Sequence, residues 1–162
     1  MIYIKLIRLF ILLFFALMIQ LFIPIINIEG FAIVPDILII FLTYIGFYYG
    51  RFQAILFGFL FGFFQDFFTQ LELLGIMSLT KSIMGFLLGS LTLYHSIWSI
   101  RFRLFIIFII YILHFTFFYF ISMNGLIISE IFFIKIILCQ AILCFCILLF
   151  FDKTIMHNGI LK

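Results

Sequence analysis

Apolar stretches separated by short polar breaks run through the whole chain. A membrane-spanning helix needs about 17 to 25 mainly apolar residues, and the chain contains six stretches close to that length. The breaks between them are too short to hold a soluble domain. The pattern therefore predicts a single domain over 1–162, an all-α integral membrane bundle with six transmembrane helices at about 6–26, 34–50, 52–69, 80–98, 104–123 and 131–151.

The composition agrees with a membrane location. The 162 residues are 69% hydrophobic and only 9% charged, whereas soluble domains are nearer half apolar. A chain this apolar would have too few polar side chains to cover a water-facing surface. The composition therefore favours an integral membrane protein over a soluble domain.

The basic residues are distributed unevenly, and this predicts an orientation. If the six spans alternate in direction, Lys81 and Lys135 fall on one side of the membrane and the other seven of the nine basic residues on the opposite side. Positively charged loops stay in the cytoplasm, so both termini are predicted to be cytoplasmic. The seven residues are Lys5, Arg8, Arg51, Arg101, Arg103, Lys153 and Lys162.

Sequence motifs for catalysis or cofactor binding are missing. Neither HExxH nor GxSxG occurs in the chain. Asp36 and Asp66 could share a proton as a hydrolytic dyad, but they lack the glycine–aspartate motif of intramembrane aspartyl proteases. The three cysteines match no zinc or haem spacing. We expect no catalytic residue, no cofactor, no bound metal and no nucleic-acid partner.

Spans two to four each contain a charged residue, and these three residues predict a polar cluster. A carboxylate inside a span costs roughly 2.5–3.5 kcal/mol on insertion scales, so it rarely faces lipid. Asp36, Asp66 and Lys81 all lie towards the external ends of spans two to four. Lys81 either extends to the external interface or forms an ion pair with Asp66 or Asp36. We predict a structural and coupling role for these three residues.

Glycines spaced four apart predict close helix packing in the same three spans. Small residues at this spacing let two helix backbones approach each other. Asp66 lies on the same helix face as two of these glycines, which points it into the bundle. Pro35 is expected in the first turn of its helix, and Gly75 in a turn before span four. The predicted packing residues are Pro35, Gly46, Gly50, Gly58, Gly62, Gly75, Gly85 and Gly89.

Three further polar residues lie in the remaining spans. Gln20, His114 and Gln140 belong to spans one, five and six. The small-residue faces of spans two to four are taken up by the internal core. Helices in lipid associate by close packing and polar contacts. We therefore predict that these three residues face a partner helix, although His114 could also bond to a neighbouring helix of its own bundle or relay protons.

The segment from Val34 to Gly89 contains VPDILIIFLTYIGFYYGRFQAILFGFLFGFFQD followed by LLGIMSLTKSIMGFLLG, and this pattern resembles the rod shape-determining protein MreD family. That family pairs a proline–aspartate entry to span two with a G-xxx-G-xxx-D run in span three. A leucine–glycine turn follows, and then a Ser-or-Thr/Lys entry to span four with a close glycine pair. The resemblance covers about residues 33–90, and its positions are Pro35, Asp36, Gly58, Gly62, Asp66, Leu74, Gly75, Thr80, Lys81, Gly85 and Gly89.

The resemblance implies a function in cell shape. A member of this family would be a non-catalytic, multi-pass subunit of the bacterial inner membrane that binds MreC. Through MreC it would be linked to MreB and to the glycosyltransferase–transpeptidase pair that builds lateral peptidoglycan. The family fold is similar to the substrate-binding subunit of energy-coupling-factor vitamin transporters. A vitamin-binding subunit of that kind is therefore the alternative, and membrane lipid is an expected partner in either case.

Overall fold

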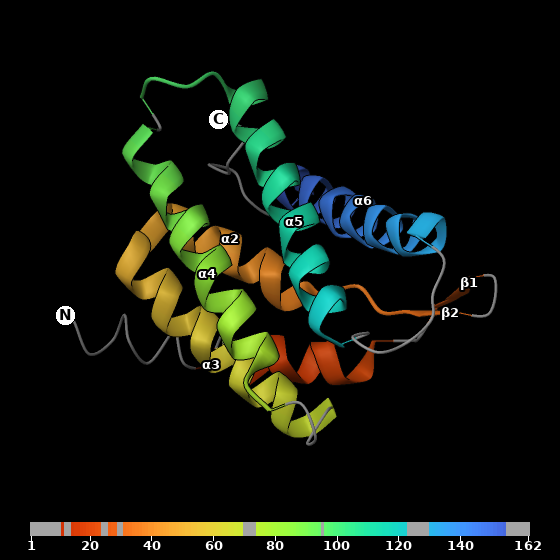
Figure 1. Cartoon of the computed structure of the whole chain (residues 1–162). Helices are drawn as coiled ribbons and strands as arrows, with labels where there is room; N and C mark the ends of the chain where they lie inside the picture. Colours follow the sequence, from red (N-terminus) through yellow and green to blue (C-terminus); the bar gives the residue numbers. More distant parts are fainter. Residues whose placement is uncertain are drawn as a thin grey trace.

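Helices make up most of the computed structural model of the chain, shown in Figure 1. The structure describes residues 11, 14–23, 26–28, 31–69, 74–94, 96–122 and 130–154. Residues 14–22 are helical. The elements that follow are β1 (Ile26–Ile28), β2 (Phe31–Ile33), α2 (Ile37–Tyr49), α3 (Arg51–Thr69), α4 (Ile76–Ser90), the 3-10 helix η2 (Leu91–Tyr94), α5 (Ile100–Ser122) and α6 (Glu130–Thr154).

Four of the described helices are long and apolar enough to cross a membrane. They are α3, α4 together with η2, α5 and α6. The predicted span 34–50 is different, because α2 has only 13 residues. At 1.5 Å per residue it is about 20 Å long, shorter than the roughly 30 Å of bilayer hydrocarbon. The first predicted span, 6–26, lies partly outside the described residues.

A short β-hairpin occupies the break that the apolar pattern left between the first two spans. β1 and β2 pair antiparallel, with Ile26 opposite Ile33 and Ile28 opposite Phe31. In Figure 1 the hairpin projects away from the helices. β-Branched and aromatic residues favour extended backbone, which suits this segment to strands. The prediction of a helical bundle is therefore confirmed for the described helices, and the structure adds one two-stranded sheet.

Glycines bring α3 and α4 into close contact along most of their length. A Cβ on Gly58 would overlap the backbone of Lys81, and one on Gly62 would overlap the backbone of Met77. From the other side, a Cβ on Gly85 would overlap the backbone of Ala54. Gly89 packs in the same way on Arg51. The antiparallel pair α3–α4 is consequently the most extensive helix contact of the bundle.

Gly46 attaches α2 to this pair, because a Cβ there would lie 3.0 Å from the Gly89 nitrogen. Two other predicted packing glycines have a different role. Gly50 ends α2 with φ 88°, and Gly75 precedes α4 with φ 106°. Neither has a neighbouring atom within 4 Å of a Cβ position. They are turn glycines, since only glycine adopts such backbone angles without strain.

Pro35 also differs from its prediction. Helix α2 begins at Ile37 with Asp36 as its N-cap. Pro35 therefore lies before the helix rather than in its first turn. The residue before a proline is pushed toward extended backbone, and residues 34–36 are indeed non-helical and join the hairpin to α2.

The inward face of α5 carries polar groups among aromatic ones. Buried residues recur at helical spacing along it: Arg103, Ile107, Ile110, Tyr111, His114, Phe115, Phe118 and Tyr119. Helix α5 begins at Ile100, so Arg103 belongs to the helix rather than to the loop predicted before 104. Its guanidinium lies 5.7 Å from the centre of the Phe47 ring.

Candidate functional site

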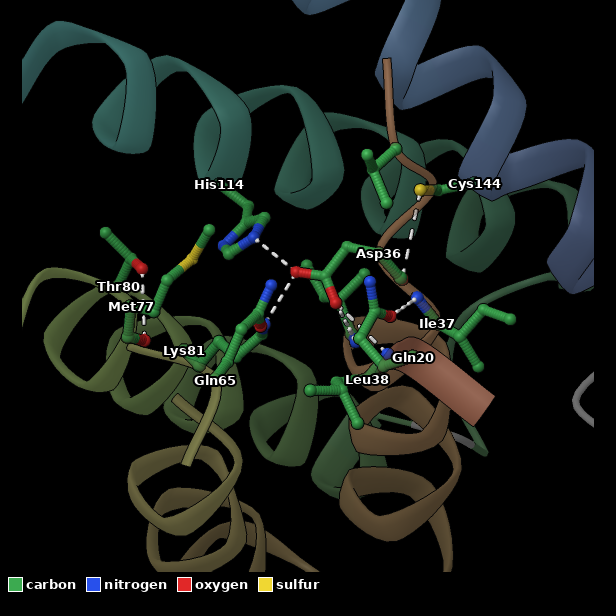
Figure 2. A network of polar contacts seen from close by, with 12 residues as sticks. Gln20, Asp36, Ile37, Leu38, Gln65, Met77, Thr80, Lys81, His114 and Cys144 are labelled. Carbon is green, nitrogen blue, oxygen red and sulfur yellow. Dashed lines mark hydrogen bonds and ion pairs between the residues drawn. The ribbon is translucent and has the colours of Figure 1, made fainter. Parts of the chain in front are cut away.

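Asp36 lies at the centre of a buried polar network that links α2 to α3, α4, α5 and α6 (Figure 2). It is only 3% exposed. Its Oδ1 accepts hydrogen bonds from the backbone nitrogens of Leu38 at 3.1 Å and Ile39 at 3.4 Å. A side-chain oxygen in this position satisfies N–H groups that have no partner within the helix. One carboxylate oxygen of Asp36 thus caps α2, and the other is left to contact neighbouring helices.

That second oxygen pairs with Lys81 of α4 and contacts His114 of α5. The Lys81 Nζ lies 2.6 Å from Asp36 Oδ2, and His114 Nε2 lies 3.2 Å from the same atom. Neither Lys81 nor His114 has exposed surface. Gln65 of α3 accepts a further hydrogen bond from Lys81 through its Oε1. Lys81 therefore points into the bundle and does not extend to the interface.

Asp66 is not the described partner of Lys81. Its carboxylate instead accepts hydrogen bonds from the backbone nitrogens of Gly75 at 2.9 Å, Met77 at 3.1 Å and Ser78 at 3.3 Å. These N–H groups belong to the start of α4, where the helix dipole also favours a negative charge. The predicted cluster of Asp36, Asp66 and Lys81 is therefore divided into an Asp36–Lys81 ion pair and a separate Asp66 cap.

The three residues predicted to face a partner helix instead bond to other groups of the same chain, with His114 and Gln140 buried and Gln20 half-buried. Gln20 donates to the Pro35 carbonyl oxygen at 3.2 Å and accepts from the Ile37 nitrogen at 2.7 Å. Gln140, 6% exposed, donates to the Val34 carbonyl oxygen at 2.7 Å. His114 has no exposed surface. The partner-facing prediction was wrong for Gln20 and Gln140, because the non-helical stretch before α2 leaves backbone groups inside the bundle that need partners. For His114 the alternative expectation, a bond within its own bundle, is confirmed by its contact with Asp36.

Three partners of this network were missed in the sequence. The Tyr119 hydroxyl donates to Gln140 Oε1, and the Tyr111 hydroxyl lies 2.8 Å from Thr43 Oγ1. The Cys144 thiol contacts the Asp36 carbonyl oxygen at 3.9 Å. Tyr111 and Tyr119 are eight residues apart in a phenylalanine-rich span, and this spacing puts them within about 80° of each other around the helix. That periodicity was the available signal.

A cavity of about 410 Å³ lies beside Asp36. Residues 14–23, the start of α2, the end of α3, α4, α5 and α6 all contribute to its lining. Its apolar walls include Leu17, Phe68 and Phe118. The polar lining residues are Gln20, Asp36, Gln65, Thr69, Tyr119 and Gln140.

The network holds the helices of the bundle together. Each carboxylate accepts several hydrogen bonds from groups that it orders, and Asp36 is neutralised by Lys81. Within the part of the chain that the structure describes, no three His, Cys, Asp or Glu side chains are grouped so that they could hold a metal ion. The arrangement links the start of α2 to α4 and α5 and fixes the start of α4 on α3.

The fold and the site define a helical protein with four helices able to cross a membrane and a buried ion pair between them. Comparison with known proteins identifies no matching family model, no matching curated protein and no matching solved structure.

Proposed function

We propose that the chain is a non-catalytic subunit of the bacterial inner membrane that resembles the rod shape-determining MreD family. In this role it binds MreC directly and helps to regulate lateral peptidoglycan synthesis and cell shape. Its links to MreB and to the glycosyltransferase–transpeptidase pair run through MreC. The proposal includes six spans, two cytoplasmic termini and a fold similar to the substrate-binding subunit of energy-coupling-factor transporters.

One observation carries the proposal: the residues of the family pattern form a single packed unit. Asp36 contacts Lys81, Asp66 caps the helix that begins after Gly75, and the glycine pairs bring α3 against α4. These residues are spread over the segment 33–90 in the sequence. Their convergence supports the view that the pattern specifies a structural core and not a set of reacting groups.

The alternative, a vitamin-binding transporter subunit, would use the cavity beside Asp36. Such a site needs several polar groups that converge and remain free to hold a polar ligand. Here Gln140 and Tyr119 already bond to the backbone or to each other, and Asp36 is paired with Lys81, which leaves chiefly the amide N–H groups of Gln20 and Gln65 for a ligand. This favours the structural subunit over the transporter subunit.

Co-purification from the native membrane distinguishes these two functions. The chain, tagged at its C-terminus and expressed from its own promoter, is purified in a mild detergent, and co-purifying proteins are identified by mass spectrometry. An unrelated tagged multi-pass protein from the same cells is the control. Enrichment of MreC over the control supports the proposal. Enrichment of a transporter ATPase without MreC would replace it with the alternative.

A further inference from the structure

The cavity beside Asp36 has the dimensions of a small-molecule site. Its volume of about 410 Å³ falls within the range of roughly 300 to 1,000 Å³ that is common for ligand pockets. Several elements of the bundle reach it, from residues 14–23 to α6. A molecule bound there would touch elements that are far apart in the sequence.

The walls of the cavity are mainly apolar. Leu17 and Leu21 line one part, Phe68 another, and Phe115 and Phe118 of α5 a third. Burying an apolar chain or ring against such side chains is favourable by about 25 cal/mol per Å² of area removed from water. The cavity therefore suits a ligand with an apolar body.

The unused hydrogen-bonding groups at the cavity are chiefly donors. Gln65 accepts from Lys81 through its oxygen, and no described residue supplies an acceptor for its side-chain nitrogen. The Gln20 amide donates one hydrogen bond, to Pro35, and a primary amide carries two N–H groups. These free N–H groups would be satisfied by acceptor oxygens on a ligand.

The charge at the cavity is already balanced. Among the lining residues that the structure describes, Asp36 is the only charged one, and Lys81 lies 2.6 Å from it. A charged ligand would lose its hydration without meeting an unpaired opposite charge, which is costly in an apolar environment. The lining therefore selects for a ligand without net charge.

We infer that this cavity binds a neutral amphipathic molecule. Its apolar body lies against Phe68, Phe115 and Phe118, and its acceptor oxygens meet the amide groups of Gln65 and Gln20. The acyl chains and ester carbonyls of a neutral glycerolipid have this chemistry. So does a neutral soluble ring compound with hydroxyl and carbonyl oxygens. Binding of this ligand does not depend on the partnership with MreC.

Two probes distinguish the membrane source from the aqueous source. The first is a photoreactive diacylglycerol added to the protein in lipid nanodiscs, and the second is the fluorescent neutral glycoside 4-methylumbelliferyl glucoside in the buffer. Saturable binding of each is measured for the wild type and for Thr69→Trp, which fills the cavity from α3. Ser90→Trp is the matched control, because Ser90 and Thr69 each donate to a carbonyl of their own helix, four residues earlier, and Ser90 is outside the cavity.

Thr69→Trp should weaken binding of at least one probe about tenfold or more by occupying the site, while Ser90→Trp leaves it unchanged. The probe that binds identifies the source. Leu21→Trp fills the cavity from a different element and should have the same effect. The attachment site of the photolabel gives a reading that needs no variant, with Phe115 or Phe118 expected if the lipid binds. Failure of both probes to saturate, or saturable binding that neither tryptophan weakens, would overturn the inference.

Discussion

Removing the charge of Lys81 should destabilise the protein more than removing both charges of its ion pair. Lys81 has no exposed surface, and its ammonium lies 2.6 Å from Asp36. Losing one member of a buried pair costs about 3–5 kcal/mol, because the other charge is left without a partner. We expect Lys81→Met near the lower end of that range, since Asp36 keeps its bonds to Leu38, Ile39 and His114.

Asp36→Asn should fall near the upper end of the same range, because Lys81 then keeps Gln65 as its one described partner. The double variant has no buried charge at this point. Its asparagine can still cap α2, and methionine fills much of the space of the lysine stem. The double variant should therefore cost less than either single change, which with these values means a coupling free energy of at least about 5 kcal/mol.

The assay is equilibrium unfolding in mixed micelles with increasing sodium dodecyl sulfate, followed by helical circular dichroism and by fluorescence of the single tryptophan, Trp98. Lys153→Met is the control, because it removes the same charge from an exposed position near the end of α6. That control should change the free energy of unfolding by less than about 0.5 kcal/mol. Additive effects of the two changes at Asp36 and Lys81 would refute direct pairing.

Three further predictions test the remaining parts of the structure. Asp66→Ala should lower the free energy of unfolding by about 1–2 kcal/mol through loss of the α4 cap. Asp66→Asn should lower it less in the same unfolding assay. Equal effects of the two changes would contradict capping. Gly62→Ala should cost about 1–3 kcal/mol by overpacking α3 against Met77, and Ser90→Ala, which leaves the α3–α4 contact intact, should be nearly neutral by thermal unfolding. Single cysteines can be placed at Glu130 and Arg101 after the native cysteines are replaced, and labelled in intact cells with an impermeant thiol reagent. Glu130→Cys should react and Arg101→Cys should not. The reverse result would invert the predicted orientation.

Local patterns in the sequence predicted the helices and the close packing between α3 and α4. The lengths of the apolar stretches predicted helices close to α3, α5 and α6. The spacing of Gly58, Gly62 and Gly85 indicated which faces of the helices pack together. Both features depend on residues of one segment at a time. The prediction that Asp66 points into the bundle has the same basis, since it shares a face with Gly58 and Gly62.

The partners of the polar residues could not be predicted in the same way. Whether Lys81 meets Asp36 or Asp66 depends on how α2 and α3 are placed around α4, and apolar spacing contains no such information. Asp66 caps a helix that starts ten residues later, across a turn whose geometry depends on Gly75. The inward positions of Gln20 and Gln140 follow from the unpaired backbone of residues 34–37, which a continuous span 34–50 would not have had.

Cross-linking in the native membrane tests the central claim, that the chain is an MreC-binding structural subunit, most directly. A photoreactive amino acid is placed in turn at exposed positions of α3, α5 and α6, such as Phe59, Phe105 and Ile142. Cross-linked products are then detected with antibodies against MreC. We expect an MreC cross-link at one or more of these positions and none at the buried position Phe61. The absence of an MreC product at every exposed position, with both proteins expressed together, would contradict it.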